Sequence, residues 1–397
     1  MDVTRALRSS HAVDLFQGPD QGSVDPKGGA FPVGNLLARA AADPYHAVIY
    51  QMGNAPAHDF MYEWMERVPG VVVLHDLVLH HSFARRYLES PESRDYAADP
   101  SNREKRLRAE KSHASYLEAV EKSYPGTGER LKDAYFNSAG DLLPYAFPLF
   151  EPALAHALAV GVHNSCMAEA VRAARPDVEC FKLAMPVRAQ AVSAVSTAAL
   201  RTRLGLSSNS AIVGCFGLVT REKRIETVAR AIARLAEIHP NVRLLLAGPV
   251  SDPPWLGALL DRTGVSPRAV VAGRLEPGDF VAAMVLTHAV VHLRYPTGRE
   301  TSAALLRVMA QGRPVVISDL ANQKEIPHDV VRRVDSCDEE GDLTRALDGI
   351  LTNRPAAEAM GERARRFVAI EHSEVRTRET YEQLLKSLAP PCSRSRP

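Results

Sequence analysis

The sequence predicts an α/β protein with two doubly wound parallel sheets, and three observations lead to that prediction. Short apolar strands alternate with longer amphipathic helices along most of the chain, which is typical of parallel sheets covered by helices on both faces. The alternation stops near Pro186 and then starts again. A chain of 397 residues is also too long for one ordinary core. We expect domains at residues 1–188 and 189–370, followed by a crossover helix and tail at 371–397.

Four strands are expected in the first half, because β-branched apolar runs there are bounded by glycine or polar residues. They fall at residues 46–53, 70–76, 157–165 and 180–187. Residues 55–68 and 166–174, which lie between strands, have the apolar spacing of helices. Residues 99–122 form a further helix whose acidic and basic residues interleave, which favours a solvent-exposed face over a membrane or phosphate patch.

The second half restarts the pattern after a small, polar segment at 187–210 that suits a linker and a lead-in helix. Its expected strands fall at residues 211–217, 242–248, 269–273, 285–294 and 314–319. Amphipathic helices are expected at 224–238 and directly after Ser302. The last stretch, 356–388, is helical and is expected to cross back onto the first domain.

Composition narrows the classes of function. Hydrophobic residues make up 46% and charged residues 24%, with a net charge of +1, which indicates a soluble globular protein without a nucleic-acid partner. The sequence shows no secretory leader and no apolar run of about 18 residues, so we expect a cytoplasmic protein without a membrane span. The five cysteines are scattered, as is typical of reduced thiols, and no metal-ligand spacing occurs. Abundant Ala, Val and Arg indicates a GC-rich bacterial genome.

Cations follow the first strand of the second half, at the sheet edge where doubly wound proteins bind their ligands. Gly217 ends this strand, and Arg221, Lys223 and Arg224 stand before the next helix. These cations are placed to neutralise a diphosphate. An exposed basic loop that pairs with neighbouring glutamates is an equal alternative.

Two further strand ends in the second half extend this set. The segment Gly273, Arg274 and Leu275 offers backbone groups and a flat guanidinium that can hold a base. Thr301 and Ser302 begin a helix, whose free N–H groups and positive dipole end bind phosphate well. An ordinary helix also places a Ser or Thr cap at this position. Together the three strand ends favour a nucleotide diphosphate site.

In the first half, the strand at 70–76 ends in His75 and Asp76. A lone buried histidine is usually structural. A His–Asp pair at the carboxyl end of a strand that faces the other domain instead favours a functional role.

The order of these segments resembles the nucleotide-sugar half of GT-B glycosyltransferases of family 4. The resemblance rests on FGLVTREKRIETVARAIARL, VRLLLAGP, VVAGRL and RETSAALLRVMAQGRPVVISD. The first half resembles the acceptor domain of the same enzymes, through VIYQMGNAPAHDFMYEWMERVPGVVVLHDLVLHH and GVHNSCMAEAVRAA. The resemblance covers nearly the whole chain. It implies a GT-B fold, in which two Rossmann-like domains face each other across a cleft.

The resemblance also implies an activity, namely retaining transfer of a sugar from a nucleotide diphosphate sugar to an acceptor without a metal. A GDP- or UDP-sugar donor and a small soluble acceptor, such as a natural-product or metabolic intermediate, are expected, with no tightly bound cofactor. A homodimer is a candidate assembly. A nucleotide-sugar epimerase and a non-catalytic nucleotide-sugar-binding partner subunit are alternatives that turnover assays would separate.

Several residues match positions with known roles in the family. Lys223 matches the lysine that holds the donor diphosphate, and Arg221 lies near a second cationic position, though at unusual spacing. His75 matches the histidine that contacts the transferred sugar, and Asp76 is expected to fix its tautomer. The segment 273–275 matches the one that lines the base.

One departure concerns the two glutamates, separated by seven residues, that the family commonly has. Arg299 and Arg307 stand at those positions, and because arginine only donates hydrogen bonds, the ribose contact made by Arg307 must differ. The expected donor contacts nearby are Gly298, Glu300, Thr301 and Ser302. We expect close backbone approach at the glycine, sugar hydroxyls at the glutamate and the distal phosphate at the two hydroxyl residues.

A second departure lies at the start of the sequence. The family has a first strand and a Gly-rich loop that shapes the acceptor site, whereas MDVTRALRSSHAVDLF resembles the helix and strand that come next in that pattern. Either the first strand is missing, or HAVDLF with the loop GPDQGSVDPKGGAFP takes its place.

Overall fold

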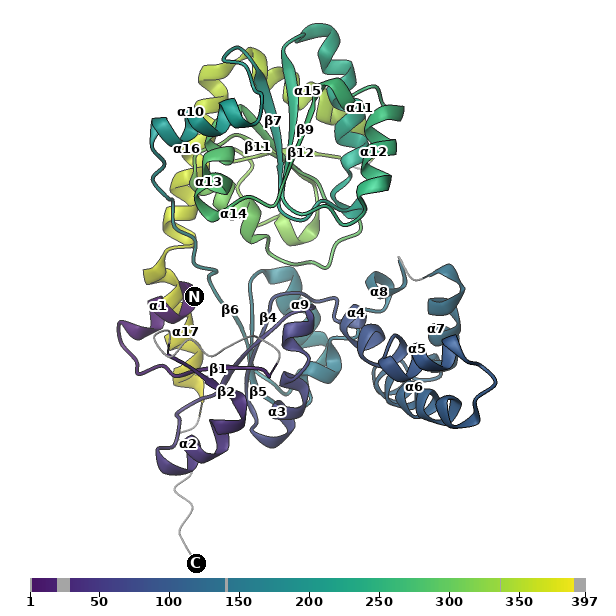
Figure 1. Ribbon diagram of the computed structural model, residues 1–397. Helices are drawn as coiled ribbons and strands as arrows, with labels where there is room; N and C mark the ends of the chain where they lie inside the picture. The colour runs from purple at the N-terminus through teal and green to yellow at the C-terminus, as the bar shows by residue number, and fades with distance from the viewer. Residues whose placement is uncertain (1, 20–28, 140–141, 336, 389–397) are drawn as a thin grey trace, which may run out of the picture.

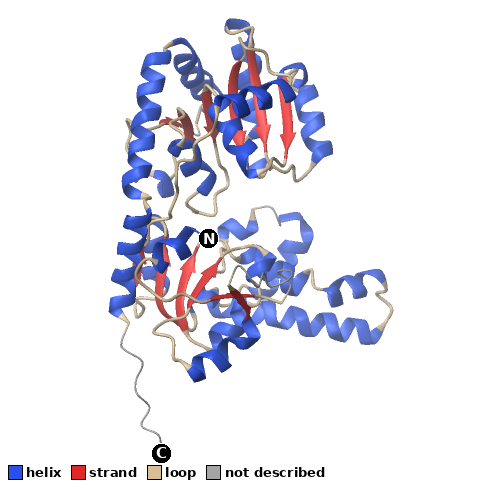
Figure 2. Cartoon of the chain, turned by 60° about the vertical axis from the view of Figure 1, so that its left-hand side comes forward, coloured by secondary structure: helices blue, strands red, loops and turns tan. Residues whose placement is uncertain are grey.

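Two parallel sheets, one in each half of the chain, form the framework of the protein (Figures 1 and 2). The computed structural model describes residues 2–19, 29–139, 142–335 and 337–388. The α/β class and the two doubly wound units predicted from the sequence are confirmed. The bounds at 188 and 370 stay a prediction, since the first sheet ends at Lys182 and the second begins at Ala211.

The first sheet has the parallel strand order β3-β4-β5-β6. Its strands are β3 (Ile49–Met52), β4 (Gly70–Leu74), β5 (Ala157–Val162) and β6 (Cys180–Lys182). Every residue of β4 is buried, because successive side chains point to opposite faces and both faces are covered. One face packs on α2 (Leu36–Ala42), α3 (Met61–Arg67) and α9 (Ser165–Ala174). The other face packs on a helix from the far end of the chain.

The second sheet has six parallel strands in the order β12-β11-β10-β7-β8-β9. They are β7 (Ala211–Phe216), β8 (Val242–Ala247), β9 (Ala269–Gly273), β10 (Ala289–His292), β11 (Val315–Ser318) and β12 (Arg332–Val334). Helices α11 (Ile225–Ile238), α12 (Pro253–Arg262) and α15 (Glu339–Thr352) cover one face. Helices α10 (Ala194–Arg203), α13 (Pro277–Leu286), α14 (Ala303–Ala310) and α16 (Arg354–Glu371) cover the other.

The predicted return to the first domain is confirmed by α17 (Glu374–Ser387), which follows α16 down one side of the molecule (Figures 1 and 2). Tyr381 and Leu384 of α17 are fully buried against β4 and β5. The N-terminal helix α1 (Asp2–Arg8) packs on α17, where Arg5 Nε donates to Glu374 Oε1 at 2.6 Å. The first domain is therefore completed by the last helix of the chain.

A helical arm projects from the first domain between β4 and β5 (Figure 1). It contains α4 (His80–Phe83), α5 (Pro91–Ala98), α6 (Arg103–Ser123), α7 (Gly128–Ala134) and α8 (Leu143–Ala146). The arm has its own small core around the fully buried Tyr116. Helix α6 confirms the charged helix predicted from the sequence, and exposed pairs such as Arg106–Glu110 lie along it. No helix within the described ranges is long and apolar enough to cross a membrane.

The N-terminal segment answers part of the question raised by the missing first strand. β1 (Leu15–Gln17) overlaps the last two residues of HAVDLF and pairs in parallel with β2 (Ala30–Pro32), as a sheet separate from the four-stranded one. HAVDLF therefore supplies a strand, but not one bonded to the main sheet. Residues 20–28 of the loop lie outside the described residues.

Two helical glycines give a matched test of this packing. A Cβ at Gly361 of α16 would lie 2.1 Å from the carbonyl oxygen of Gly312, whereas one at Gly349 of α15 would meet nothing within 4 Å. Gly361→Ala should lower the free energy of unfolding by about 2 kcal/mol, because backbone cannot yield as a side chain can. Gly349→Ala should raise it by about 0.5–1 kcal/mol through helix propensity. Urea denaturation measures both, and equal effects of one sign would contradict this packing.

Candidate active site

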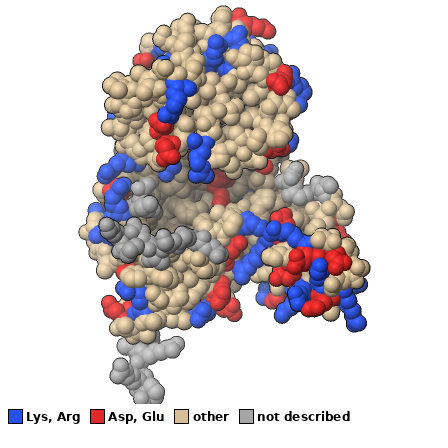
Figure 3. Space-filling model, viewed as in Figure 1, with Lys and Arg blue, Asp and Glu red and all other residues tan. Residues whose placement is uncertain are grey.

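The carboxyl ends of the two sheets face each other across a cleft, which Figure 3 shows as a hollow between the upper and lower halves. Loops at these ends touch directly. Leu77 N donates to Gly298 O at 3.1 Å, and Asn164 Nδ2 donates to Arg299 O at 2.9 Å. Thr301 Oγ1 donates to His163 O at 3.2 Å, so the segment 298–301 is bonded to the first domain at three points.

Charged side chains from both domains meet beside these contacts. Arg294, which follows β10, pairs with Glu300 at 2.9 Å between Nη2 and Oε1. Both side chains are largely buried, with 25% and 15% of their surface exposed. Asp76 faces them from the first domain. Burial raises the pKa of the Asp76 carboxyl and the Glu300 carboxylate raises it further, so two acidic groups approach each other across the cleft.

Lys223 lies at the base of the same cleft. Its Nζ donates to the carbonyl oxygen of Phe216 at 2.5 Å, beside Gly217, whose φ of 87° few other residues adopt. A Cβ at Gly217 would lie 3.0 Å from the Lys223 nitrogen, so a glycine keeps this space open. Burial and the neighbouring Arg294 lower the pKa of Lys223 to about 8. Lys223 and Arg294 are cations that repel each other, and Glu300 is the ion-pair partner of Arg294. This arrangement favours the binding of a further anion.

His75 belongs to a chain of hydrogen bonds that crosses the first domain. His163 Nδ1 lies 3.0 Å from Leu183 O and must donate to it, so His163 Nε2 accepts from His75 Nδ1 at 3.1 Å. Burial and the neighbouring His163 lower the pKa of His75 to about 3, which keeps it neutral. His75 Nε2 lies 2.8 Å from one end of the Gln51 side-chain amide, and the other end of that amide bonds to the hydroxyl of Tyr381 at 3.3 Å. Both ring nitrogens of His75 are occupied.

The prediction that Asp76 fixes the tautomer of His75 is wrong. The ring of His75 bonds to His163 and Gln51, whereas Asp76 Oδ2 accepts from Asn54 N at 3.3 Å. Both residues lie beyond the end of β4 at Leu74, and their side chains reach different surroundings.

The sequence allowed two interpretations of the start of this helix, a phosphate site or an ordinary Ser or Thr cap. The structure shows the cap. Ser302 is the N-cap of α14, and its Oγ accepts from Leu305 N at 3.3 Å. Thr301 bonds to the first domain instead, since its hydroxyl also accepts from Asn164 Nδ2 at 3.1 Å. The backbone of Glu300 is held by Asn322 Nδ2, 2.9 Å from its carbonyl oxygen. A phosphate role for the N–H groups of this turn stays a prediction.

The other predicted site residues make their contacts away from Lys223. Arg221 pairs with Asp252 at 3.1 Å and lies over the ring of Trp255. Arg274 and Arg307 are exposed, and within the described residues neither guanidinium forms a hydrogen bond or an ion pair. Leu275 packs against the core of the second domain behind the strand end at Gly273, whose φ is 63°. The structure thus gathers Asp76, Lys223 and Glu300 but turns Arg221 away.

Sequence reasoning missed several residues of this cleft. Arg294 follows a strand directly, so the rule used for Lys223 could have found it. His163 and Asn164 also end a strand, β5, although their partners lie over 80 residues away and no local pattern indicates them. Tyr145, from the arm, lies near Glu222 and Arg294; burial and Glu222 raise its pKa to about 12, against the opposing effect of Arg294. Within the described ranges, no group of three His, Cys, Asp or Glu side chains is arranged to hold a metal.

Comparisons with known proteins agree with this architecture. The family model described as Glycosyl transferases group 1 matches residues 210–353, which include Lys223, Arg294 and Glu300. No curated protein sequence matches the chain.

Solved structures resemble the whole chain. Sucrose-phosphate synthase from Thermosynechococcus elongatus has a TM-score of 0.61 at 16% identity, over 97% of this chain and 92% of that one. WaaG, a glycosyltransferase involved in lipopolysaccharide biosynthesis, has 0.58 at 13%, over 98% and 94%. Anabaena HepE in complex with UDP and glucose has 0.56 at 14%, over 86% and 98%. At such identities the likeness establishes the fold: two Rossmann-like domains in the GT-B arrangement.

The N-cap can be tested directly. Ser302→Ala should lower the free energy of unfolding without ligand by about 1 kcal/mol, because Leu305 N loses its acceptor. Ser302→Gly is the matched control and should cost only a few tenths of a kcal/mol, since water reaches the freed N–H. Urea denaturation of both variants provides the comparison, and an unchanged Ser302→Ala midpoint would exclude the cap.

Proposed function

We propose that this chain is a retaining glycosyltransferase of the family 4 type, which moves a sugar from a nucleotide diphosphate sugar to an acceptor. The observation that carries the proposal is the pair of buried cations Lys223 and Arg294, which repel each other at the carboxyl ends of β7 and β10. A diphosphate bound there would relieve that repulsion. The family-model match and the likeness to HepE, whose structure contains UDP and glucose, support this assignment.

In the proposed reaction the bond between the sugar and the diphosphate breaks, and negative charge develops on the leaving oxygen. Lys223 and Arg294 stabilise that charge from fixed positions, which is the main catalytic contribution of such sites. Arg294 thus takes the role expected of Arg221, which pairs with Asp252. The departing phosphate accepts the proton of the attacking acceptor hydroxyl, so the reaction needs neither a metal nor a separate base.

Glu300 and Asp76 face the space where the sugar would lie. The Glu300 carboxylate accepts hydrogen bonds from sugar hydroxyls, and Asp76, whose pKa burial raises, can share a proton with them. His75 has both ring nitrogens occupied, so we assign it a positioning role within the first domain, through Gln51 and His163, in place of the sugar contact.

The same geometry also supports positions for the nucleotide base and for the acceptor. The base of a UDP- or GDP-sugar would lie along residues 273–275 beyond β8, with Arg274 exposed beside it. We assign the acceptor, a small soluble molecule, to the first-domain side, where Tyr145 of the arm lies near Asp76 and Glu300.

Turnover tests the proposal. The chain should release nucleoside diphosphate from a UDP- or GDP-sugar when a suitable acceptor is present. Lys223→Ala should lower this rate by about 100-fold and weaken nucleoside diphosphate binding by about tenfold, because a charge-assisted contact to the phosphates is lost. Nucleoside binding should change by less than about twofold. Coupled nucleotide release and calorimetry measure the two effects.

Arg221→Ala is the matched control for the same loop. Its exposed pair with Asp252 contributes little, so affinity and turnover should fall by less than about threefold. An epimer formed from the donor alone would overturn transfer in favour of isomerisation. Donor binding without turnover across all acceptors would identify a non-catalytic subunit.

The pKa of Lys223 predicts a pH dependence. Without ligand the amine is charged below about pH 8, and a bound diphosphate raises its pKa, so binding takes up a proton above that pH. Nucleoside diphosphate affinity should therefore fall above pH 8, by up to about tenfold per pH unit. Lys223→Arg should remove the fall, because the guanidinium stays charged. Calorimetry from about pH 7 to 9.5 tests this, and a flat wild-type profile would refute the assignment.

A further inference from the structure

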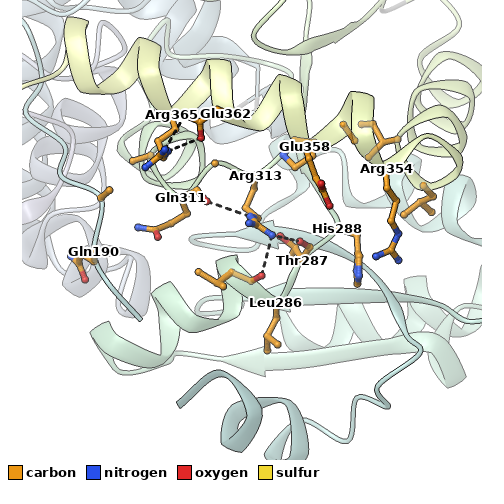
Figure 4. A pocket seen from close by; sticks show the side chains of 18 of the residues that line it. Gln190, Leu286, Thr287, His288, Gln311, Arg313, Arg354, Glu358, Glu362 and Arg365 are labelled. Carbon is orange, nitrogen blue, oxygen red and sulfur yellow. Dashed lines mark hydrogen bonds and ion pairs between the residues drawn. The ribbon is translucent and has the colours of Figure 1, made fainter. Parts of the chain in front are cut away.

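A second cavity lies at the amino ends of strands of the second sheet. The candidate active site lies at the opposite, carboxyl ends. Its volume is 790 Å³, which is within the range of small-molecule sites. Thr287 and His288, which precede β10, and Pro314, which precedes β11, form its floor. Residues of α16 and of the linker between the domains form its walls (Figure 4).

Four arginines and two glutamates line this cavity, so four positive charges face two negative ones and a net charge of +2 remains. Arg365 pairs with Glu362 through two hydrogen bonds, at 2.9 and 2.8 Å. In the described part of the chain, Arg201, Arg313 and Arg354 have no carboxylate within ion-pair distance. The cavity therefore has an excess of cations.

Arg313 is the most buried of these arginines. Its Nη1 donates to the carbonyl oxygens of Val285 and Thr287, at 3.3 and 3.4 Å, and its Nε to that of Gln311. Burial lowers the pKa of Arg313, with Glu358 acting in the opposite direction. A guanidinium held by neutral carbonyls is a favourable partner for an incoming anion.

His288 adds a hydrogen-bond donor to the same surface. Its Nδ1 accepts from Ile212 N at 2.9 Å, so the neutral imidazole carries its proton on Nε2. Burial lowers the pKa of His288, and Arg354, Arg201 and Arg313, which also line the cavity, add to the shift and bring it to about 4. Figure 4 shows His288 beside Arg354.

The cavity also touches both chain connections between the domains. Ala189, Gln190 and Ala191 of the linker line it, as does α16, which leads into the crossing helix α17. Once its amide is turned over, Gln311 bonds both backbone polar groups of Gln190, at 3.1 and 2.9 Å. Beyond the cavity the two connections bond to each other, since Val187 N donates to His372 O at 2.9 Å.

We propose that this cavity is a second anion site, which binds a phosphorylated small molecule with two or more negative charges at the hinge between the domains. The phosphates contact Arg201, Arg313 and Arg354, and His288 Nε2 donates to one of them. Because the walls belong to the linker and to α16, an occupant ties together the two segments about which the domains would turn.

Calorimetry with inorganic pyrophosphate on the full chain tests this site. In a Lys223→Ala background, which weakens the cleft site, pyrophosphate should still bind with a stoichiometry near one. Adding Arg201→Gln and Arg354→Gln should then weaken that binding by at least about tenfold, because two charge-assisted contacts are lost. Both side chains extend from helices and are not part of a core, and thermal unfolding confirms that the variants fold.

Arg230→Gln with Arg262→Gln is the matched control, since it removes the same charge from α11 and α12 outside the cavity. It should change pyrophosphate affinity by less than about twofold. An equal loss in this control would overturn the proposal in favour of diffuse charge. Absence of binding in Lys223→Ala would show that no second site exists. Nucleotide-sugar turnover by the Arg201→Gln, Arg354→Gln chain is measured separately, so the proposed function stands or falls independently.

Discussion

The hydrogen bonds that join residues 298–301 to the first domain decide where the charged groups of the cleft lie. Leu77 holds the backbone of Gly298, and the loop after β5 holds Thr301. Glu300 lies between these two points, so its side chain is directed to Arg294 and towards Asp76. The two halves of the site belong to different sheets, and this contact helps to bring them together.

The buried charged groups of this cleft are not fully compensated by their neighbours. Burial pushes the pKa of Lys223 down and that of Asp76 up, each towards its neutral form. Arg294 reinforces the shift of Lys223, and Glu300 reinforces that of Asp76. Shifts of this kind concentrate where a protein is organised to bind a charged partner. An anion beside Lys223 reverses the first shift, and a polar sugar beside Asp76 replaces water that burial has excluded.

Part of this site was predicted from the sequence by the rule that ligands bind at the carboxyl ends of parallel strands. Lys223, Glu300 and Asp76 all follow strands, and the structure gathers them. The rule does not say where a side chain points, however, so it assigned His75 and Asp76 to each other. His75 instead bonds to Gln51, which in turn bonds to Tyr381 over 300 residues later. Contacts of that separation, like the arm that supplies Tyr145, depend on tertiary packing and have no local signature.

The two proposed anion sites lie at opposite ends of one buried strand. His288 precedes β10 and Arg294 follows it, which separates them by roughly 20 Å at the rise of a strand. That distance exceeds the screening length of about 8 Å at physiological salt, so direct repulsion between their ligands is weak. Every residue of β10 is buried between two layers of helices, which makes the strand a poor moving part. Any coupling between the sites must therefore pass through the hinge, where the linker and α16 set the approach of Asp76 to Glu300.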